Sequence, residues 1–117
     1  MSRRMERVNG LLLREISDII TGHINDPRLS AFTTVTGVDT SSDLSMAKVF
    51  VSVLGDQAAK EDTLAALRSA SGFVRRSLRE RLTLRSVPAM DFRIDDSIER
   101  GAELIKLIDK VAPDPED

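Results

Sequence analysis

Arginine side chains are the groups in this sequence best suited to chemistry, and the chemistry that they suit is phosphate binding. Arginine outnumbers lysine 13 to 4, and a guanidinium group can bind a phosphate through two hydrogen bonds. Two segments concentrate the charge. Residues 1–14 hold four arginines and one glutamate, and residues 63–85 hold six arginines and one glutamate. These clusters predict a surface that binds nucleic acid, with a solvated helix face as the alternative interpretation.

The net charge of −2 does not oppose this prediction, because the charges are segregated along the chain. Residues 95–117 hold eight acidic and three basic residues, a net charge of −5, so that residues 1–94 carry +3. The local field, and not the net charge, attracts a phosphate backbone.

Other reactive groups are too few for catalysis. His23 is the only histidine and there is no cysteine, so we expect no metal site, no nucleophile–histidine relay and no cofactor. Asp95 and Asp96 form a carboxylate pair, but Glu99 follows Asp96 at the spacing of a capping box. We therefore expect this pair to begin a helix. The sequence predicts a protein that is not an enzyme and has no small-molecule substrate.

Aromatic side chains are scarce. There is no tryptophan or tyrosine, and we expect the four phenylalanines to lie mostly in the core. Stacking on unpaired bases is then poorly provided for, so backbone and shape contacts should dominate RNA binding.

Hydrophobic spacing predicts the elements that position the arginines. Val8, Leu12 and Ile16 recur with a helical period, and Val49 and Val51 alternate as in a strand. The expected helices cover residues 4–23, 61–69, 72–84 and a last segment from residue 96, and the expected strands cover residues 32–39, 47–54 and 89–95.

The order of these elements predicts the topology. A short turn at residues 40–43 makes the first two strands a hairpin. A long helical connection leads to the third strand, which implies parallel pairing with the second. One sheet with helices packed on one face is an α+β fold. We expect one domain over residues 1–111, followed by a disordered acidic tail over residues 112–117.

Small residues interrupt the second arginine cluster. Ala70, Ser71 and Gly72 separate the two helices within it, and glycine inside a helix costs about 1 kcal/mol relative to alanine. Two interpretations remain open. The small residues permit either tight packing of the helices on the sheet or close approach of an RNA backbone to the N–H groups that begin the second helix.

Six short motifs follow one another between residue 7 and about residue 108. They are Asp26-Pro27-Arg28-Leu29, Thr34-Val35-Thr36-Gly37-Val38, Asp43-Leu44 with Ala47-Lys48-Val49, Ala70-Ser71-Gly72-Phe73-Val74-Arg75, Leu82-Thr83-Leu84-Arg85 with Val87-Pro88, and Phe92 with Asp95-Asp96-Ser97. With these motifs the chain resembles the bacterial ribosome-binding factor A family. The resemblance implies a type II K-homology fold in which the Ala-Ser-Gly joint replaces the usual Gly-x-x-Gly loop.

The resemblance also implies a ribosome assembly factor that binds the small ribosomal subunit and its RNA during late maturation and rRNA processing, often important for growth in the cold. We expect a cytoplasmic monomer that does not bind membranes, because no apolar run approaches the roughly 20 residues that span a bilayer. The expected RNA-binding residues are Arg3, Arg4, Arg7, Arg14, Arg28, Ala70, Ser71, Gly72, Arg75, Arg76, Arg79 and Arg85.

Arg75, Arg76 and Arg79 are expected to be exposed together on one helix face.

Two alternatives to this function stay open. A generic K-homology protein that binds single-stranded RNA is the first alternative. A protein–protein adaptor that uses the apolar face of the last helix is the second.

Overall fold

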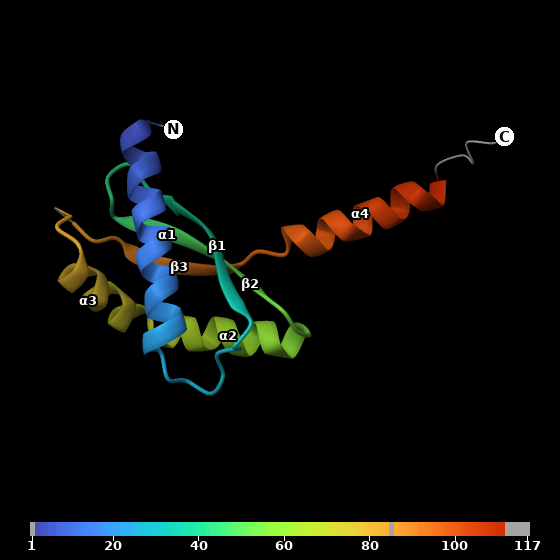
Figure 1. Ribbon diagram of the computed structural model, residues 1–117, viewed down its shortest axis with the longest axis horizontal. Coiled ribbons are helices and arrows are strands. Elements are labelled where there is room, and N and C mark those ends of the chain that lie inside the picture. The colour runs from blue at the N-terminus through green and yellow to red at the C-terminus, as the bar shows by residue number, and fades with distance from the viewer. Residues whose placement is uncertain (1, 85, 112–117) are drawn as a thin grey trace.

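The computed structural model describes residues 2–84 and 86–111, which form four helices and one three-stranded sheet (Figure 1). The elements are α1 (Arg3–His23), β1 (Thr33–Thr40), β2 (Met46–Val53), α2 (Gln57–Ser69), α3 (Ser71–Arg81), β3 (Ala89–Ile94) and α4 (Ser97–Val111). This order confirms the predicted α+β fold of the type II K-homology kind with an added C-terminal helix. The predicted tail over residues 112–117 lies outside the described residues.

β2 is the central strand of the sheet. It pairs antiparallel with β1, from Thr33 opposite Val53 to Thr40 opposite Ala47, and parallel with β3. Both pairings were predicted from the lengths of the connections, and both are confirmed. A bulge between Val35 and Gly37 shifts the register of β1 by one residue.

Alternation along β2 places the core on one side of the sheet. Val49, Val51 and Val53 are buried, whereas Met46 and Lys48 on the other face are exposed. The three valines share one core with side chains from three helices, so α1, α2 and α3 all cover the same face. The helical contribution comes from Val8, Leu12, Ile16, Ile19, Ile20, Leu67, Val74 and Leu78.

Two helix ends differ from the prediction. α2 begins four residues earlier than expected, because the carboxylate of Asp56 accepts a 2.9 Å hydrogen bond from the N–H of Ala59 and caps the helix. α3 ends at Arg81 instead of residue 84. Leu82 is already extended, and Leu82 and Leu84 pack against the core from there. Burial of these two side chains therefore overrides their helix propensity.

The predicted capping box at the start of α4 is wrong. The carboxylate of Asp96 forms a 2.7 Å ion pair with Arg100, and Glu99 reaches Lys60 on α2. Asp95 instead accepts a 2.9 Å hydrogen bond from the backbone N–H two residues further on. The carboxylate pair thus begins a helix, as expected, but Asp95 and not Asp96 accepts the backbone N–H at its start.

Arg81 fastens α3 to α1. Its Nη1 atom lies 3.2 Å from Oε2 of Glu15 and 2.5 Å from Oδ2 of Asp18, so one guanidinium joins two carboxylates of the neighbouring helix. The hydrogen bond from Arg81 lowers the pKa of Asp18 below its usual value. The link must therefore weaken when Asp18 is protonated.

We expect Arg81→Gln to destabilise the protein in a pH-dependent manner. Because the folded-state pKa of Asp18 is depressed, its contribution is fully present above the unfolded-state value of about 3.9 and is lost as the pH falls through the folded-state pKa. The melting temperature of the variant should lie below that of the wild type at pH 7, and the difference should shrink between pH 5 and pH 3. Arg79→Gln on the same helix is the control. An Arg81 difference that is constant across this range would contradict the assignment.

Two glycines sit in different backbone environments. Gly55, between β2 and α2, has φ of 154°, and a Cβ atom added there would lie 2.8 Å from Cβ of Ala59. Gly72 lies inside α3, and an added Cβ would meet only Nη1 of Arg76 at 3.5 Å. A side chain is therefore excluded at Gly55 and tolerated at Gly72.

We expect Gly55→Ala to lower the free energy of unfolding by roughly 1–3 kcal/mol, through backbone strain and the close contact. Gly72→Ala should leave it unchanged or raise it by up to about 1 kcal/mol, because alanine is the better helix former. Urea unfolding followed by circular dichroism measures both. Equal destabilisation by the two substitutions would show that both glycines are needed for packing.

Candidate nucleic-acid interface

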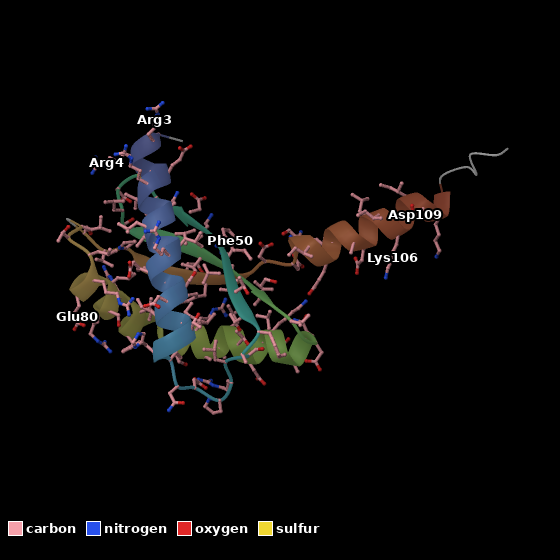
Figure 2. The ribbon with its side chains drawn as sticks, viewed as in Figure 1. Arg3, Arg4, Phe50, Glu80, Lys106 and Asp109 are labelled. Carbon is pink, nitrogen blue, oxygen red and sulfur yellow. The ribbon has the colours of Figure 1, made fainter. Side chains whose placement is uncertain are left out.

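The outer side of α1 carries three of the predicted RNA-binding arginines. Arg3, Arg7 and Arg14 are exposed and lie opposite the buried stripe of this helix, so they point away from the sheet. Figure 2 shows Arg3 and Arg4 at the N-terminal end of α1, projecting from the body of the protein. From Arg3 to Arg14 the helix rises by roughly 16 Å, which is the distance over which these charges are spread along α1.

Arg76 and Arg79 are exposed on the outer side of α3, as predicted, but Arg75 is not. Arg75 is half-buried, and its Nε–H donates a 3.1 Å hydrogen bond to the carbonyl oxygen of Val87. The prediction that all three arginines are exposed together is therefore wrong. Arg75 is turned toward the segment that leads into β3, because that carbonyl lies within reach of its long side chain.

Arg68, which was not among the expected site residues, lies exposed in the last turn of α2. Its place two residues before Ala70, in the last turn of the predicted helix over residues 61–69, could have indicated it. It completes a set of exposed arginines that we call the helix-face arginines. They are Arg3, Arg4, Arg7, Arg14, Arg68, Arg76 and Arg79.

Within residues 2–84 and 86–111, none of the helix-face arginines forms an ion pair. The charge of Arg81, in contrast, is neutralised by ion pairs with Glu15 and Asp18 on α1. Arg85 belonged to the expected site and lies outside the described residues. The helix-face arginines are the cations of the helix layer whose charge an external anion can neutralise.

Arg28 has a structural partner and a place near the helix joint. It forms a 2.8 Å ion pair with Asp26 and donates a 3.3 Å hydrogen bond to Oγ of Ser69 at the end of α2. The same pairing lowers the pKa of Asp26 and raises that of Arg28. The N–H of Arg28 also bonds to the Asp26 carboxylate at 2.9 Å, so the Asp-Pro-Arg motif fixes a turn and brings its arginine next to Ala70.

The joint between α2 and α3 consists of a single non-helical residue. Ala70 closes α2, and its carbonyl oxygen then accepts a 2.9 Å hydrogen bond from Val74 as α3 begins. No side chain caps the start of α3, because its N-cap residue is Ala70, and the Ser71 hydroxyl donates to the carbonyl oxygen of Arg68 at 2.9 Å. Gly72 is exposed, with only Arg76 near its missing side chain. Tight packing on the sheet therefore does not explain Gly72.

The phenylalanines are a correction to the sequence prediction. Phe92 is buried and Phe50 is half-buried, but Phe32 is 67% exposed and Phe73 is 38% exposed. Phe73 follows Gly72 directly and lies off the buried stripe of α3, a position that its helical spacing from Val74 could have indicated. An aromatic surface thus lies beside the joint.

A cavity of about 520 Å³ opens at the N-terminal end of α1, between Arg4, the β1–β2 turn and Ser86. Asp43 lines it, and hydrogen bonds from Ser45 and Ser41 lower the pKa of this carboxyl to about 2. A permanent negative charge therefore lies beside Arg4, which makes the cavity itself poorly suited to a phosphate.

The described part of the chain holds neither a cluster of metal ligands nor a membrane-spanning helix. No group of three or more His, Cys, Asp or Glu side chains there is placed to hold a metal ion. None of its helices combines the length and the apolar character that a membrane crossing requires.

Comparison with known proteins identifies the family. Residues 4–108 match the family described as ribosome-binding factor A. Ribosome-binding factor A of Agathobacter rectalis is 49% identical over 105 residues, covering 90% of this chain and 87% of that protein.

Solved structures agree with this match. The crystal structure of ribosome-binding factor A from Thermus thermophilus is similar with a TM-score of 0.69 and 28% identity, covering 77% of this chain and 93% of that one. A Thermus thermophilus model fitted into a cryo-EM map of a 30S–ribosome-binding factor A complex gives a TM-score of 0.62 and 27% identity, covering 75% of this chain and 91% of that one. The type II K-homology arrangement, the matched residues and these relatives together show that the chain belongs to the ribosome-binding factor A family.

Proposed function

We propose that this protein is a small-subunit assembly factor that binds immature ribosomal RNA through the outer surface of its helix layer and has no enzymatic activity. The observation that carries the proposal is the set of helix-face arginines, which are exposed and form no ion pair with the described residues. A relative from Thermus thermophilus has been fitted into a map of a 30S complex, which supports the small subunit as the partner.

The joint supplies a second kind of contact in this proposal. The first N–H groups of a helix attract an anion through their partial positive charge. At the start of α3 these groups have no side-chain cap, and Gly72 places no side chain in front of them. A phosphate of the RNA can therefore approach the backbone between Arg68 and Arg76.

The proposed contacts favour structured RNA over a short single strand. The helix-face arginines span roughly 16 Å of α1, from Arg3 to Arg14, and continue onto α2 and α3, whereas a K-homology domain with a Gly-x-x-Gly loop clamps about four nucleotides. The exposed ring of Phe73 supports the alternative of a generic single-strand binder, because it can stack on one unpaired base. We propose that stacking on Phe73 is one contact within the larger interface formed by the helix-face arginines.

The mechanism follows from differential affinity. A protein that binds one conformation of the subunit RNA more tightly than another shifts the population toward the first. Arginines held on three packed helices present a fixed spacing of charges, so only an RNA conformation with matching phosphates gains all the contacts. We propose that the factor holds this conformation during late maturation and dissociates when the RNA changes shape.

We expect Arg76→Gln combined with Arg79→Gln to weaken binding to purified small subunits by between ten- and a hundredfold near 0.1 M salt. Each lost phosphate contact should also reduce the slope of log affinity against log salt by about one. Lys106→Gln combined with Lys110→Gln, on α4, removes the same charge and is the control. If both double variants bind alike, net charge and not the helix layer governs affinity.

We expect Gly72→Leu to weaken binding by about tenfold or more while the free energy of unfolding stays near that of Gly72→Ala, because the leucine side chain would stand between the RNA and the start of α3. Fluorescence anisotropy on small subunits measures the affinity, and urea unfolding measures the stability. Wild-type affinity of a folded Gly72→Leu protein would show that the joint is not part of the interface and that the arginines alone bind the RNA.

A further inference from the structure

The cavity of about 520 Å³ at the N-terminal end of α1 opens beside the first helix-face arginines. Arg4 lines this cavity, and Arg3 and Arg7 are exposed within one turn of it along the helix. Figure 2 shows Arg3 and Arg4 projecting from this end of α1. An RNA whose phosphates bind these arginines therefore has nucleotides at the opening of the cavity.

The lining of the cavity suits a flat, neutral group with a polar edge. Among the residues that the structure describes, it holds one cation, Arg4, and one anion, Asp43, so that its charges balance. Met5 and Leu44 add apolar side chains, and three serine residues add polar ones. A mostly apolar wall with a few polar groups is typical of a ligand site, and the volume is large enough for a nucleobase. A base offers such apolar faces and such a polar edge.

The carboxylate of Asp43 is held in place by one of its two oxygen atoms. Oδ1 accepts hydrogen bonds from Oγ of Ser41 at 2.8 Å, and from the N–H and Oγ of Ser45 at 3.1 Å and 2.7 Å. Leu44 has φ of 61°, a conformation that leucine rarely adopts, and its side chain packs against the core and so fixes the turn. Within residues 2–84 and 86–111, no hydrogen bond reaches Oδ2 of Asp43. Oδ2 is therefore a positioned acceptor with two lone pairs.

Guanine is the base whose hydrogen-bonding groups match these two charged side chains. Its N1–H and N2–H donors lie side by side and can both bond to Oδ2 of Asp43, and its O6 and N7 acceptors match the guanidinium group of Arg4. Adenine and cytosine set a ring-nitrogen acceptor beside their amino group, and uracil flanks its one N–H with two carbonyl oxygens. An ionised carboxylate is acceptor-only, so it is repelled by the acceptors of these three bases.

We propose that this cavity binds the base of an unpaired guanine in ribosomal RNA, with Asp43 accepting from N1–H and N2–H and Arg4 donating to O6 and N7. The inference rests on the proposed function, which brings the RNA to α1. The helix-face arginines bind phosphates of any sequence, whereas a base-edge contact distinguishes one sequence from another. The cavity would therefore fix the register in which the protein lies on the RNA.

The experiment compares short RNA hairpins that differ in a single loop base. The stem offers phosphates to the helix-face arginines, and the uridine loop carries one guanine, inosine or adenine. We expect the wild type to bind the guanine hairpin about tenfold more tightly than the adenine hairpin, by fluorescence anisotropy. Inosine lacks the N2 amino group, so its hairpin should fall between the two.

Two variants with the same charge change locate the contact. Asp43→Asn keeps an oxygen for Ser41 and Ser45 but places an amide donor where guanine also donates, so the preference for guanine over adenine should fall to about twofold or less. Asp39→Asn, on β1 and away from this cavity, should keep the tenfold preference. Partial unfolding lowers both affinities by the same factor, so the ratio of the two affinities reports on the cavity and not on stability.

Three results would overturn the inference and leave the proposed function standing. They are a wild type that binds purified small subunits but shows no guanine preference among the hairpins, an equal loss of preference in Asp39→Asn and Asp43→Asn, and competition by guanosine monophosphate at the concentration at which the guanine hairpin competes. The last result would assign the cavity to a free nucleotide, because the monophosphate lacks the neighbouring phosphates of the RNA. Failure of the wild type to bind both the hairpins and the subunits would overturn the proposed function itself.

Discussion

Burial of the central strand β2 is the constraint on which the rest of the structure depends. Val49, Val51 and Val53 point to one side, and they remove their methyl groups from water only if helices cover that side. Because β1 and β3 flank β2 and reinforce the same face, α1, α2 and α3 must all pack there. Their own buried stripes then point inward, and whatever lies opposite those stripes becomes the outer surface of the protein.

This packing divides the arginines by role. Those opposite a buried stripe, such as Arg7 and Arg76, are carried outward and meet no acid in the described chain. Those at the flank of a helix meet a neighbouring element instead. Arg81 reaches α1, and Arg75 reaches the backbone before β3. The first group leaves charge available for a partner, and the second uses its charge or its hydrogen bonds to hold the helix layer together.

The same logic explains why α4 lies outside the core. α4 begins after the chain has left β3 and the sheet, away from the face that carries Val49, Val51 and Val53. Its apolar side chains therefore do not enter the core.

The sequence by itself determined the elements, their order and the pairing of the strands, because helical and alternating periods are local properties and connection length decides parallel from antiparallel. It also determined that Arg76 and Arg79 are exposed, since their spacing from Val74 and Leu78 is enough. Only the tertiary structure decided which cations are free. Arg28 and Arg81 have partners on other elements, Arg75 bonds to a distant carbonyl, and Phe73 is left at the surface. The groups that a long side chain contacts depend on distances in the folded structure, and the periodicity of the sequence does not encode those distances.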